Sequence, residues 1–382
     1  MRVACIHPQE LDGSLKADWG GLRAASPRYL SPYFHPRFAE LVGAERPDAR
    51  VLVIEDGGRT VGFWGLHKRP DGFARPLGQP LADDNGPILH PEAEIDLAAA
   101  LRAAGIGAAA FTGAPCPPAS LARFALETDE SAQVDVSAGG AATLAALKAA
   151  HGTHFKNMRR KERRVVETIG PIRYAAGVQD PAALDQVIAW KRAQFVRTGL
   201  FDVLAPAWTR ALLKALAEET DPALQGMLTT LHLGDALAAA EFSLRSGGHL
   251  HSWITAYDPQ FSVCSPGHLM QMRMIESADA IGLKLIDCGV GAGHYKRFYA
   301  NASMVLMRGV VSAASVSGAV HHWRSRLWRA AESAAPGDAF GRLRRRSEII
   351  VSAEQSLGGR VHGFVQAFRH AGSRAGAADA GG

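Results

Sequence analysis

The chain has 382 residues, of which 47% are hydrophobic and 21% charged. This composition is typical of a soluble globular protein and excludes the disordered, collagen-like and coiled-coil classes. At about 150 residues per domain, the length predicts two domains and an appendage. The net charge of +5 is unevenly placed, because residues 1–319 hold 32 Lys and Arg against 32 Asp and Glu, whereas residues 320–382 hold 10 Arg against 5 acids.

Export and metal-binding patterns are missing from the sequence. The first residues, MRVACIHPQE, lack the apolar core of a signal peptide, and no run of about 18 apolar residues occurs. The cysteines lie far apart, with no C-x-x-C pair and no His cluster at zinc-finger spacing: Cys5, Cys116, Cys264 and Cys288. We therefore expect a cytoplasmic protein with reduced thiols and no bound metal.

A meander of three strands is predicted over residues 49–78, with turns at Gly57-Gly58 and Asp71-Gly72. A helix over 92–104 and a strand over 106–112 follow it. Between the meander and this helix lies the loop Asp83-Asp84-Asn85-Gly86-Pro87. A long helix is then predicted over about 140–169, carrying HFKNMRRKERRVVE with six Lys and Arg against two acids. This helix is either a solvated face with local ion pairs or a cationic surface for an anionic donor or a glycan-lipid pyrophosphate.

A second meander over residues 224–258 repeats the plan of the first, about 175 residues later. Helices preceded by proline flank it, since proline is tolerated in a first helical turn. The predicted elements are a strand at 171–177, helices at 181–197 and 206–219, the meander, a helix at 267–281, a strand at 283–288, a short helix near 293–299 and a strand at 303–311. The repetition indicates two copies of one α/β unit, the first of them degenerate.

One glycine-rich string follows the predicted strand at 283–288: Asp287-Cys-Gly289-Val-Gly291-Ala-Gly293. Alone it suggests a methyltransferase or dinucleotide loop. Such a loop closes the first strand of a doubly wound sheet and opens a long apolar helix, whereas here HYKRFYA follows. The glycines are more simply a tight turn that brings Tyr295 and Lys296 to a cleft.

In this context the sequence resembles the CelD/BcsL family of GNAT acyltransferases associated with exopolysaccharide synthesis, possible holdfast polysaccharide enzymes among them. The resemblance covers about 137–311 closely and 15–135 more loosely. It rests on Arg159-Arg160 with Arg163-Arg164, Trp190-Lys191-Arg192, Ala256-Tyr257-Asp258-Pro259, Ser265-Pro266-Gly267-His268-Leu269, and Asp287-Cys-Gly289-Val-Gly291 leading into Tyr295-Lys296-Arg297-Phe298.

The resemblance implies an α/β (α+β) fold of tandem GNAT lobes, each a mixed, mostly antiparallel sheet flanked by helices. The expected divisions are a degenerate lobe at 1–136, a linking basic helix at 137–170, the acyltransferase lobe at 171–315, a helical Arg-rich tail at 316–370 and a disordered end at 371–382. The loop at Asp83 and Asp84 would lie near the acceptor.

The family also implies roles for single residues, each beside a structural alternative. Tyr295 would protonate the leaving thiolate, or is a packed aromatic. Glu241, an acid within the apolar run AAAEFSL, would be the catalytic base, or is exposed at an edge. His251 and His268 are alternative bases, and Asp287 would fix Lys296 or a backbone turn.

The expected donor is acetyl-CoA or another acyl-CoA. Its pyrophosphate would bind Ser265, Pro266, Gly267, His268 and Leu269, which replace the usual R/Q-x-x-G-x-G/A loop at a helix N-terminus. Because FemABX transferases share the tandem plan and use aminoacyl-tRNA, that donor is an alternative. A catalytically inactive, nucleotide-sensing scaffold is another.

The expected acceptor is an amino sugar of an exopolysaccharide or of its lipid-linked precursor. In the tail, Arg342 and Arg346 lie one helical turn apart, a spacing suited to phosphate, so cyclic di-GMP is a hypothetical regulator there. The tail could equally dock on an anionic inner membrane or on the polysaccharide machinery. No DNA-reading helix is recognisable, so DNA is not an expected partner.

Overall fold

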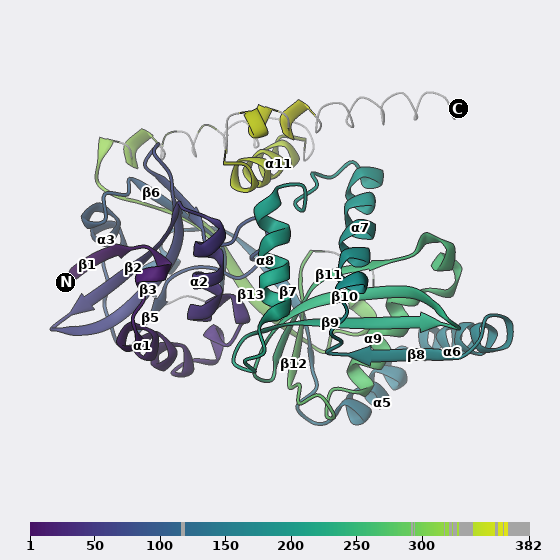
Figure 1. Ribbon diagram of the computed structural model, residues 1–382. Helices are drawn as coiled ribbons and strands as arrows, with labels where there is room; N and C mark the ends of the chain where they lie inside the picture. Colours follow the sequence, from purple (N-terminus) through teal and green to yellow (C-terminus); the bar gives the residue numbers. More distant parts are fainter. Residues whose placement is uncertain are drawn as a thin grey trace.

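A computed structural model describes residues 1–115, 119–291, 293, 295–316, 318–320, 323, 327, 339–355, 358–361 and 363–365. Two lobes are joined by one mixed sheet that runs through both of them (Figure 1). Within these residues the strand order is β1-β2-β3-β4-β6-β13-β7-β12-β11-β10-β9-β8, with β5 paired to β3. The predicted fold class, a mixed and mostly antiparallel sheet flanked by helices, is confirmed.

The first lobe contains the predicted meander. Its helix begins later than expected, because the Asp96 side chain accepts from the Ala98 and Ala99 N–H groups and starts the helix at Leu97. The elements are β1 (Arg2–Ile6), α1 (Gly13–Ala24), α2 (Pro36–Glu45), β2 (Ala49–Asp56), β3 (Arg59–Lys68), β4 (Phe73–Pro76), β5 (Ile88–Leu89), α3 (Leu97–Ala103), β6 (Ala108–Pro115), α4 (Ala119–Ala122) and β7 (Ala125–Asp135), with short 3-10 turns η1 (Pro8–Glu10), η2 (Pro27–Tyr29) and η3 (Pro32–Phe34).

The second lobe has the predicted order of elements throughout. Pro181 and Pro266 occupy the first turns of their helices, as expected from the sequence. The elements are β8 (Ile172–Ala176), α7 (Pro181–Thr198), α8 (Ala207–Glu218), β9 (Gln225–Leu233), β10 (Ala236–Ser246), β11 (His249–Tyr257), η4 (Pro259–Cys264), α9 (Pro266–Glu276), β12 (Leu285–Val290), η5 (Lys296–Phe298) and β13 (Ala302–Ser312).

The predicted single helix over 140–169 is wrong. The chain forms two helices, α5 (Gly140–Ala150) and α6 (Gly152–Thr168), because His151 between them has a non-helical backbone at φ −124° and ψ 45°. In α6, Phe155, Met158 and Val165 are buried, so the basic residues occupy the outer face.

The two lobes exchange their last strands. In each lobe the third strand of the meander pairs in parallel with the strand after the next helix, β4 with β6 and β11 with β12. Beside β6 lies β13 from the end of the second lobe, and beside β12 lies β7 from the end of the first, while β7 and β13 pair with each other. Each copy of the unit is therefore completed by a strand of the other.

A shared hydrophobic core fixes the lobes against each other. Helix α2 packs on α8, and one buried cluster includes Phe38 of the first lobe with Leu212 and Phe242 of the second. Burial of apolar side chains is the main favourable term in such an interface. The residues at the junction are consequently held in a defined geometry.

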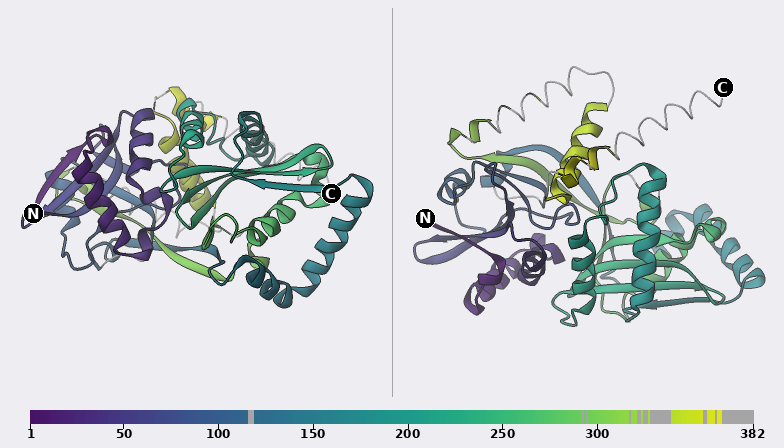
Figure 2. Two further views of the ribbon diagram at one scale, coloured as in Figure 1. Left: turned by 60° about the horizontal axis from the view of Figure 1, so that its bottom comes forward. Right: turned by 45° about the horizontal axis from the view of Figure 1, so that its top comes forward.

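The described tail contains α11 (Ala339–Ala353), which lies across the junction of the lobes (Figures 1 and 2). Backbone carbonyls at its C-terminal end accept hydrogen bonds from both lobes: Val351 from Arg69, Ser352 from Arg46 and Ala353 from Trp208. Guanidinium groups at a helix C-terminus also oppose the negative end of its dipole. The predicted disorder of 371–382 lies outside the described residues. None of the described helices is long and apolar enough to cross a bilayer.

Candidate active site at the lobe junction

The loop that carries Asp83 and Asp84 meets strand β11 where the lobes join. We call residues 77–87 the acidic loop. In β11, Ser252 and Trp253 form a bulge opposite the single residue Ser243. Trp253 Nε1 donates to the Leu81 carbonyl at 2.7 Å, and His251 Nε2 lies 3.0 Å from Asp83 Oδ2. The loop is therefore in direct contact with β11 of the second lobe, and its expected place near the acceptor stays a prediction.

Asp287 lies beside His251 because β11 and β12 pair in parallel at this register. Its carboxylate accepts hydrogen bonds from Ser131 Oγ at 2.5 Å, Gln133 Nε2 at 2.9 Å and the Gly289 N–H at 2.7 Å. Ser131 and Gln133 come from the exchanged strand β7. Burial favours the neutral acid, but the charge on His251 and these three donors keep the pKa of Asp287 below its ordinary value.

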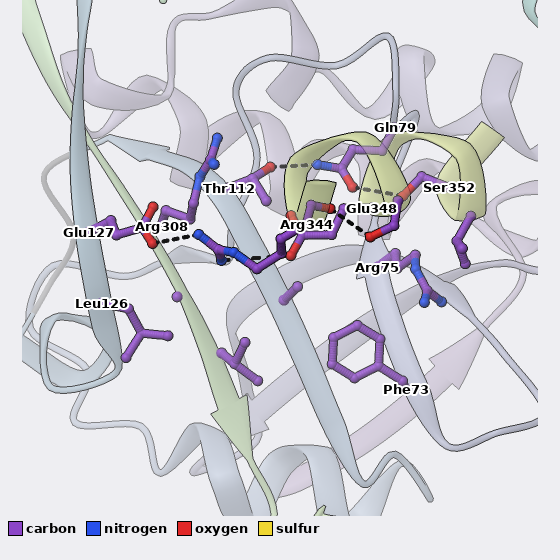
Figure 3. A pocket seen from close by; sticks show the side chains of 15 residues that line it. Phe73, Arg75, Gln79, Thr112, Leu126, Glu127, Arg308, Arg344, Glu348 and Ser352 are labelled. Atoms are coloured by element: carbon purple, nitrogen blue, oxygen red, sulfur yellow. Dashed lines mark hydrogen bonds and ion pairs between the residues drawn. The ribbon is translucent and has the colours of Figure 1, made fainter. Parts of the chain in front are cut away.

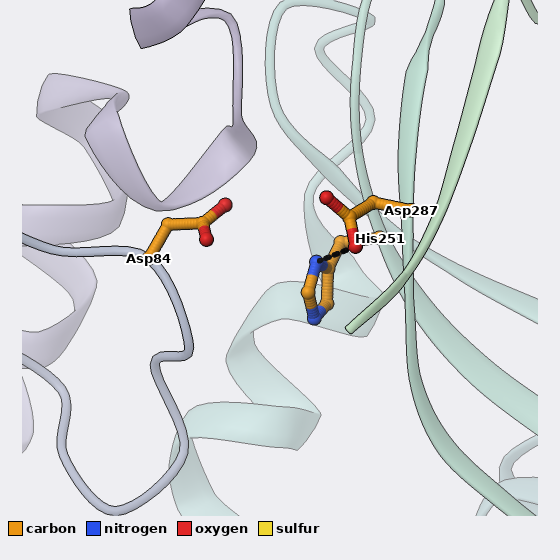
Figure 4. A group of neighbouring side chains, drawn as sticks. All are labelled: Asp84, His251 and Asp287. Carbon is orange, nitrogen blue, oxygen red and sulfur yellow. Dashed lines mark ion pairs between the residues drawn. The ribbon is translucent and has the colours of Figure 1, made fainter. Parts of the chain in front are cut away.

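His251 is fully buried, with the carboxylates of Asp84 and Asp287 on either side (Figure 4) and that of Asp83 at its Nε2 atom. Burial alone would lower its pKa, but the hydrogen bond to Asp83 and the charges of Asp287 and Asp84 raise the pKa of His251 to about 9. At neutral pH the ring is therefore an imidazolium, and Nε2 donates to Asp83. The other nitrogen, Nδ1, has no hydrogen-bond partner in the described chain and faces Asp287 Oδ1 at 3.8 Å.

Asp84 is buried without a hydrogen bond to either carboxylate oxygen from the described residues. Burial, with the charge of Asp287, raises the pKa of Asp84 to about 7, although His251 opposes the shift. In the same region Tyr33 packs edge-on against the His251 ring at 4.9 Å, and burial holds the pKa of Tyr33 well above its usual value. At neutral pH the Asp84 carboxyl is therefore protonated in part of the molecules.

Asp84, His251 and Asp287 each offer one ligand atom, and these atoms lie within 4.8 Å of one another. Two carboxylates and an imidazole are a donor set that a divalent transition metal accepts. A metal bound here would displace the proton of His251, because only a neutral imidazole is a metal ligand.

Asp83 is the most accessible of the three carboxylates around His251, with 39% of its side chain exposed. Gly289 approaches it closely, since a Cβ there would lie 3.1 Å from Asp83 Oδ2. Gly289 has φ +74° and Gly291 has φ +98°, conformations that favour glycine. The expected tight turn after β12 is present, and a side chain at position 289 would crowd the Asp83 carboxylate.

Lys296 and Asp287 both hold this turn, from opposite ends. Lys296 Nζ donates to the Gly289 and Val290 carbonyls at 2.7 and 2.8 Å, and burial lowers the pKa of Lys296. Of the two roles expected for Asp287, the structure gives it the backbone turn, through the Gly289 N–H, with no bond to Lys296.

Tyr295 follows the same turn and is 36% exposed. Burial of its hydroxyl and the nearby Cys288 and Glu241 raise the pKa of Tyr295, so the phenol stays protonated at neutral pH. This state suits the predicted donation of a proton to a thiolate, which stays a prediction. Burial also raises the pKa of Cys288 to about 12, which makes that thiol inert.

Glu241 lies on β10 and is buried rather than at an edge. Its carboxylate accepts from the hydroxyls of Ser243, Ser252 and Thr255 at 2.7, 2.6 and 2.7 Å. These bonds account for a charged group inside an apolar strand. Its role as a catalytic base remains a prediction.

The predicted donor loop forms the N-terminus of α9. Ser265 has φ +55° and makes no side-chain cap, and its hydroxyl accepts from Lys161 of α6 at 2.6 Å. Pro266 and Leu269 are buried, while Gly267 and His268 are partly exposed. His268 Nδ1 lies 3.1 Å from the Tyr299 hydroxyl, so its ring is held by the core rather than by the acidic loop.

Five exposed cations lie on the outer face of α6, and no described acid pairs with them: Lys156, Arg159, Arg160, Arg163 and Arg164. Glu162, which could neutralise them, pairs instead with Arg273 of α9. The positive end of the α9 dipole and Lys161, which donates to Ser265, give the α9 terminus a positive potential. The first lobe offers no equivalent, because Asp96 occupies the N-terminus of α3.

Residues 152–297 match the sequence model of a family described as acetyltransferase (GNAT) domain. Over this segment the second lobe is similar in sequence to GNAT acetyltransferase domains. The matched segment runs from α6 to η5 and includes His251, the α9 terminus, Asp287 and Tyr295. No curated protein matches the chain.

Solved structures with related folds span both lobes. FemX is 12% identical with a TM-score of 0.50, covering 81% of this chain and 96% of that chain. The C-terminal domain (DUF2156) of a putative lysylphosphatidylglycerol synthetase from Agrobacterium fabrum is 13% identical with a TM-score of 0.49, covering 80% and 93%. A tandem GNAT protein from the clavulanic acid biosynthesis pathway is 13% identical with a TM-score of 0.43, covering 82% and 99%. At these identities the FemX likeness shows the fold alone.

Ser131, Gln133 and Tyr33 were missed by sequence reasoning. Ser131 and Gln133 lie in ALETDESAQVD, where charged residues hide the strand pattern, and Tyr33 lies in a short turn. No sequence pattern marks these three residues. The part of the site that does stand out in the sequence is the acidic pair Asp83-Asp84, in a loop otherwise rich in Gly and Pro.

Proposed function

We propose that this protein transfers an acyl group from an acyl-CoA to the amine of an amino sugar, in an exopolysaccharide or its lipid-linked precursor. The observation that carries the proposal is the contact of Asp83, from the first lobe, with His251 of the second lobe. It puts a half-exposed carboxylate at the lobe junction, next to the glycine turn that leads into Tyr295.

The donor would bind at the α9 terminus. Its phosphates are anionic, and the uncapped start of α9 with Lys161 of α6 is the matching electropositive surface. Strands β11 and β12 pair at three positions, ending at His251 and Asp287. Beyond these residues the unpaired strand edges would leave room for the acyl-pantetheine arm to approach the turn at Gly289.

The acceptor would approach from the lobe junction, where Asp83 can accept from an ammonium or a sugar hydroxyl. A sugar is favoured over other amines by the motifs shared with the exopolysaccharide-associated family. The acceptor nitrogen attacks the thioester carbonyl, forming the N–C bond as the C–S bond breaks. The nitrogen's proton passes to Asp83, and the sulfur takes its proton from the Tyr295 hydroxyl.

Replacing Tyr295 by phenylalanine should lower kcat about tenfold or more, because the sulfur would leave without a proton donor. The substitution removes one oxygen from a partly exposed side chain, so the thermal unfolding midpoint should stay unchanged. Steady-state rates and thermal unfolding measure the two effects. An unchanged kcat would remove Tyr295 from the mechanism.

The proposal is tested by mixing the protein with acetyl-CoA and amino sugars and following free thiol release. Acceptor-dependent thiol release is expected, together with calorimetric binding of the acyl-CoA. The FemX fold favours one alternative, an aminoacyl-tRNA donor. Failure to bind any acyl-CoA would overturn the proposal, and mass spectrometry of co-purifying ligands would then separate an aminoacyl donor from a nucleotide-sensing scaffold.

Regulation by cyclic di-GMP, and attachment to the inner-membrane polysaccharide machinery, complete the proposal. Arg342 lies in α11 but its side chain is outside the described residues, and Arg346 donates to the Gly199 carbonyl at the end of α7. A ligand taking up Arg346 would compete with that bond. Titration of cyclic di-GMP against the wild type and the Arg342→Ala, Arg346→Ala double variant tests the site, and equal affinities would exclude it.

A further inference from the structure

We infer that the tail helix α11 positions the acidic loop, and so sets the place of Asp83 at the lobe junction. The catalytic part of this inference rests on the proposed function, whereas the structural coupling does not. Two sets of polar contacts connect the C-terminal end of α11 to the start of the loop, at Gly78 and at Gln79, and the second continues through Thr112 to the loop's end.

The first connection runs through a buried cluster under α11. Arg46 donates to the Ser352 carbonyl and Arg69 to the Val351 carbonyl, and both guanidinium groups pair with Asp48. Asp48 also lies 3.2 Å from His67 Nδ1.

His67 completes this connection. Its Nε2 accepts from the Gly78 N–H, at the start of the acidic loop, at 3.0 Å. Burial lowers the pKa of His67 to about 4, so the ring is neutral. A neutral imidazole has one donor and one acceptor nitrogen, which is what a bridge between Asp48 and Gly78 requires.

The second connection begins at Ser352 (Figure 3). Its hydroxyl donates to Gln79 Oε1 at 3.3 Å, and Gln79 Nε2 donates to Thr112 Oγ1 at 2.6 Å. The Thr112 N–H donates to Asn85 Oδ1 at 2.8 Å, and Asn85 Nδ2 returns a bond to Thr112 Oγ1 at 3.0 Å. Because Asn85 directly follows Asp83 and Asp84, these hydrogen bonds hold the acidic loop just after its two carboxylates.

Little freedom remains for the loop between these points. A Cβ on Gly113 of β6 would lie 1.9 Å from the Asp83 carbonyl oxygen, so the loop backbone rests directly on that strand. The Asp83–His251 contact of 3.0 Å would cease to be a hydrogen bond after a shift of well under 1 Å. A small displacement at Gly78 or Asn85 is therefore enough to separate Asp83 from His251.

Among the described side chains of α11, Ile350 is a fully buried apolar contact that a single substitution can remove. A cavity of about 220 Å³ separates part of it from the sheet, with polar side chains such as Arg344 and Glu127 paired across it (Figure 3). Ile350 is its fully buried apolar anchor. The neighbouring Ile349 is 38% exposed and offers a matched control.

The test uses full-length Ile350→Asp, with Ile349→Asp as the control, and measures hydrogen exchange by mass spectrometry. A buried carboxylate at position 350 should detach α11. We expect exchange to rise about tenfold or more in residues 339–353 and also in residues 77–87, with exchange in α9 unchanged. The control should exchange like the wild type.

Kinetics on the same proteins test the catalytic part. Ile350→Asp should lower kcat/KM for the acceptor about tenfold while acyl-CoA affinity stays unchanged, because the donor surface does not touch α11. If Ile350→Asp does not fold, Trp208→Phe removes the bond to Ala353 and keeps an aromatic ring. Faster exchange in 339–353 without a change in 77–87 would overturn the inference. Coupled exchange in a protein without transferase activity would instead overturn the proposed function and leave the coupling standing.

Discussion

Replacing Asp83 by asparagine is expected to lower kcat/KM for the acceptor about a hundredfold while the fold is retained. Removing a general base typically costs a factor of 10² to 10⁴ in rate. Asparagine keeps an oxygen that can accept from His251 Nε2, so the contact between the lobes survives. It loses the charge that would take the proton of the attacking amine.

The matched control is Asp235→Asn, which removes the same charge from the fully exposed β9–β10 turn, where Asp235 pairs with Arg173. Initial rates at varied acceptor and saturating acyl-CoA measure the effect, and calorimetry measures acyl-CoA affinity, which should be the same in all three proteins. A wild-type rate in Asp83→Asn would show that the proton leaves by another route. Loss of acyl-CoA affinity would place Asp83 at the donor instead.

The elements of the second lobe are readable from local sequence because their ends are marked by residues with strict backbone preferences. Pro181 and Pro266 start helices, and Gly234 and Gly247 form the turns of the meander with positive φ. The break at His151 has a weaker mark, Gly152 directly after it, and helical sequence continues on both sides of this glycine. A continuous helical pattern therefore misleads there.

The exchanged strands could not be anticipated, because which sheet a strand joins depends on partners far away in the chain. Strand β7 is central in the sheet, yet its buried positions include Ser131 and Gln133. These polar residues are buried because they donate to Asp287, more than 150 residues away. A pattern rule that seeks alternating apolar residues passes over such a strand.

The same limit applies to the candidate site. The sequence identified Asp83, His251 and Asp287 separately, each with a different expected role. Their meeting depends on the two lobes sharing one core, and only that arrangement turns His251 from a candidate base into an imidazolium that holds Asp83. The electrostatic state of a buried histidine is a property of its neighbours, so it has no local signature.

The free energy of unfolding is expected to fall as the pH rises from about 6.5 to about 9, with His251 as the main cause. In the folded state the pKa of His251 is raised to about 9, against about 6.5 when unfolded. Its stabilisation is fully present below pH 6.5 and is lost as the pH rises through 9. The shift corresponds to about 3 kcal/mol.

The groups that face His251 set the window. They are Asp83 and Asp84 from the acidic loop, Asp287 from β12, Tyr33 from η3 and His249 from its own strand. Asp84, whose pKa is raised to about 7, gives a loss of the same sign at lower pH, between about 4 and 7. Burial lowers the pKa of His249 to about 4, so that residue stays neutral throughout the window.

Urea unfolding at pH 6.5, 7.5 and 9 tests this on the wild type, His251→Gln and Asp83→Asn. The wild type should lose about 3 kcal/mol over the window, His251→Gln much less, and Asp83→Asn an intermediate amount, because its imidazolium keeps the Asp287 carboxylate. Equal losses in all three would contradict the assignment of the titration to His251.

The deprotonation of His251 should also lower kcat/KM at alkaline pH, because Asp83 loses its charged partner there. If the free energy of unfolding falls over this pH range while kcat/KM stays constant, His251 contributes to folding alone.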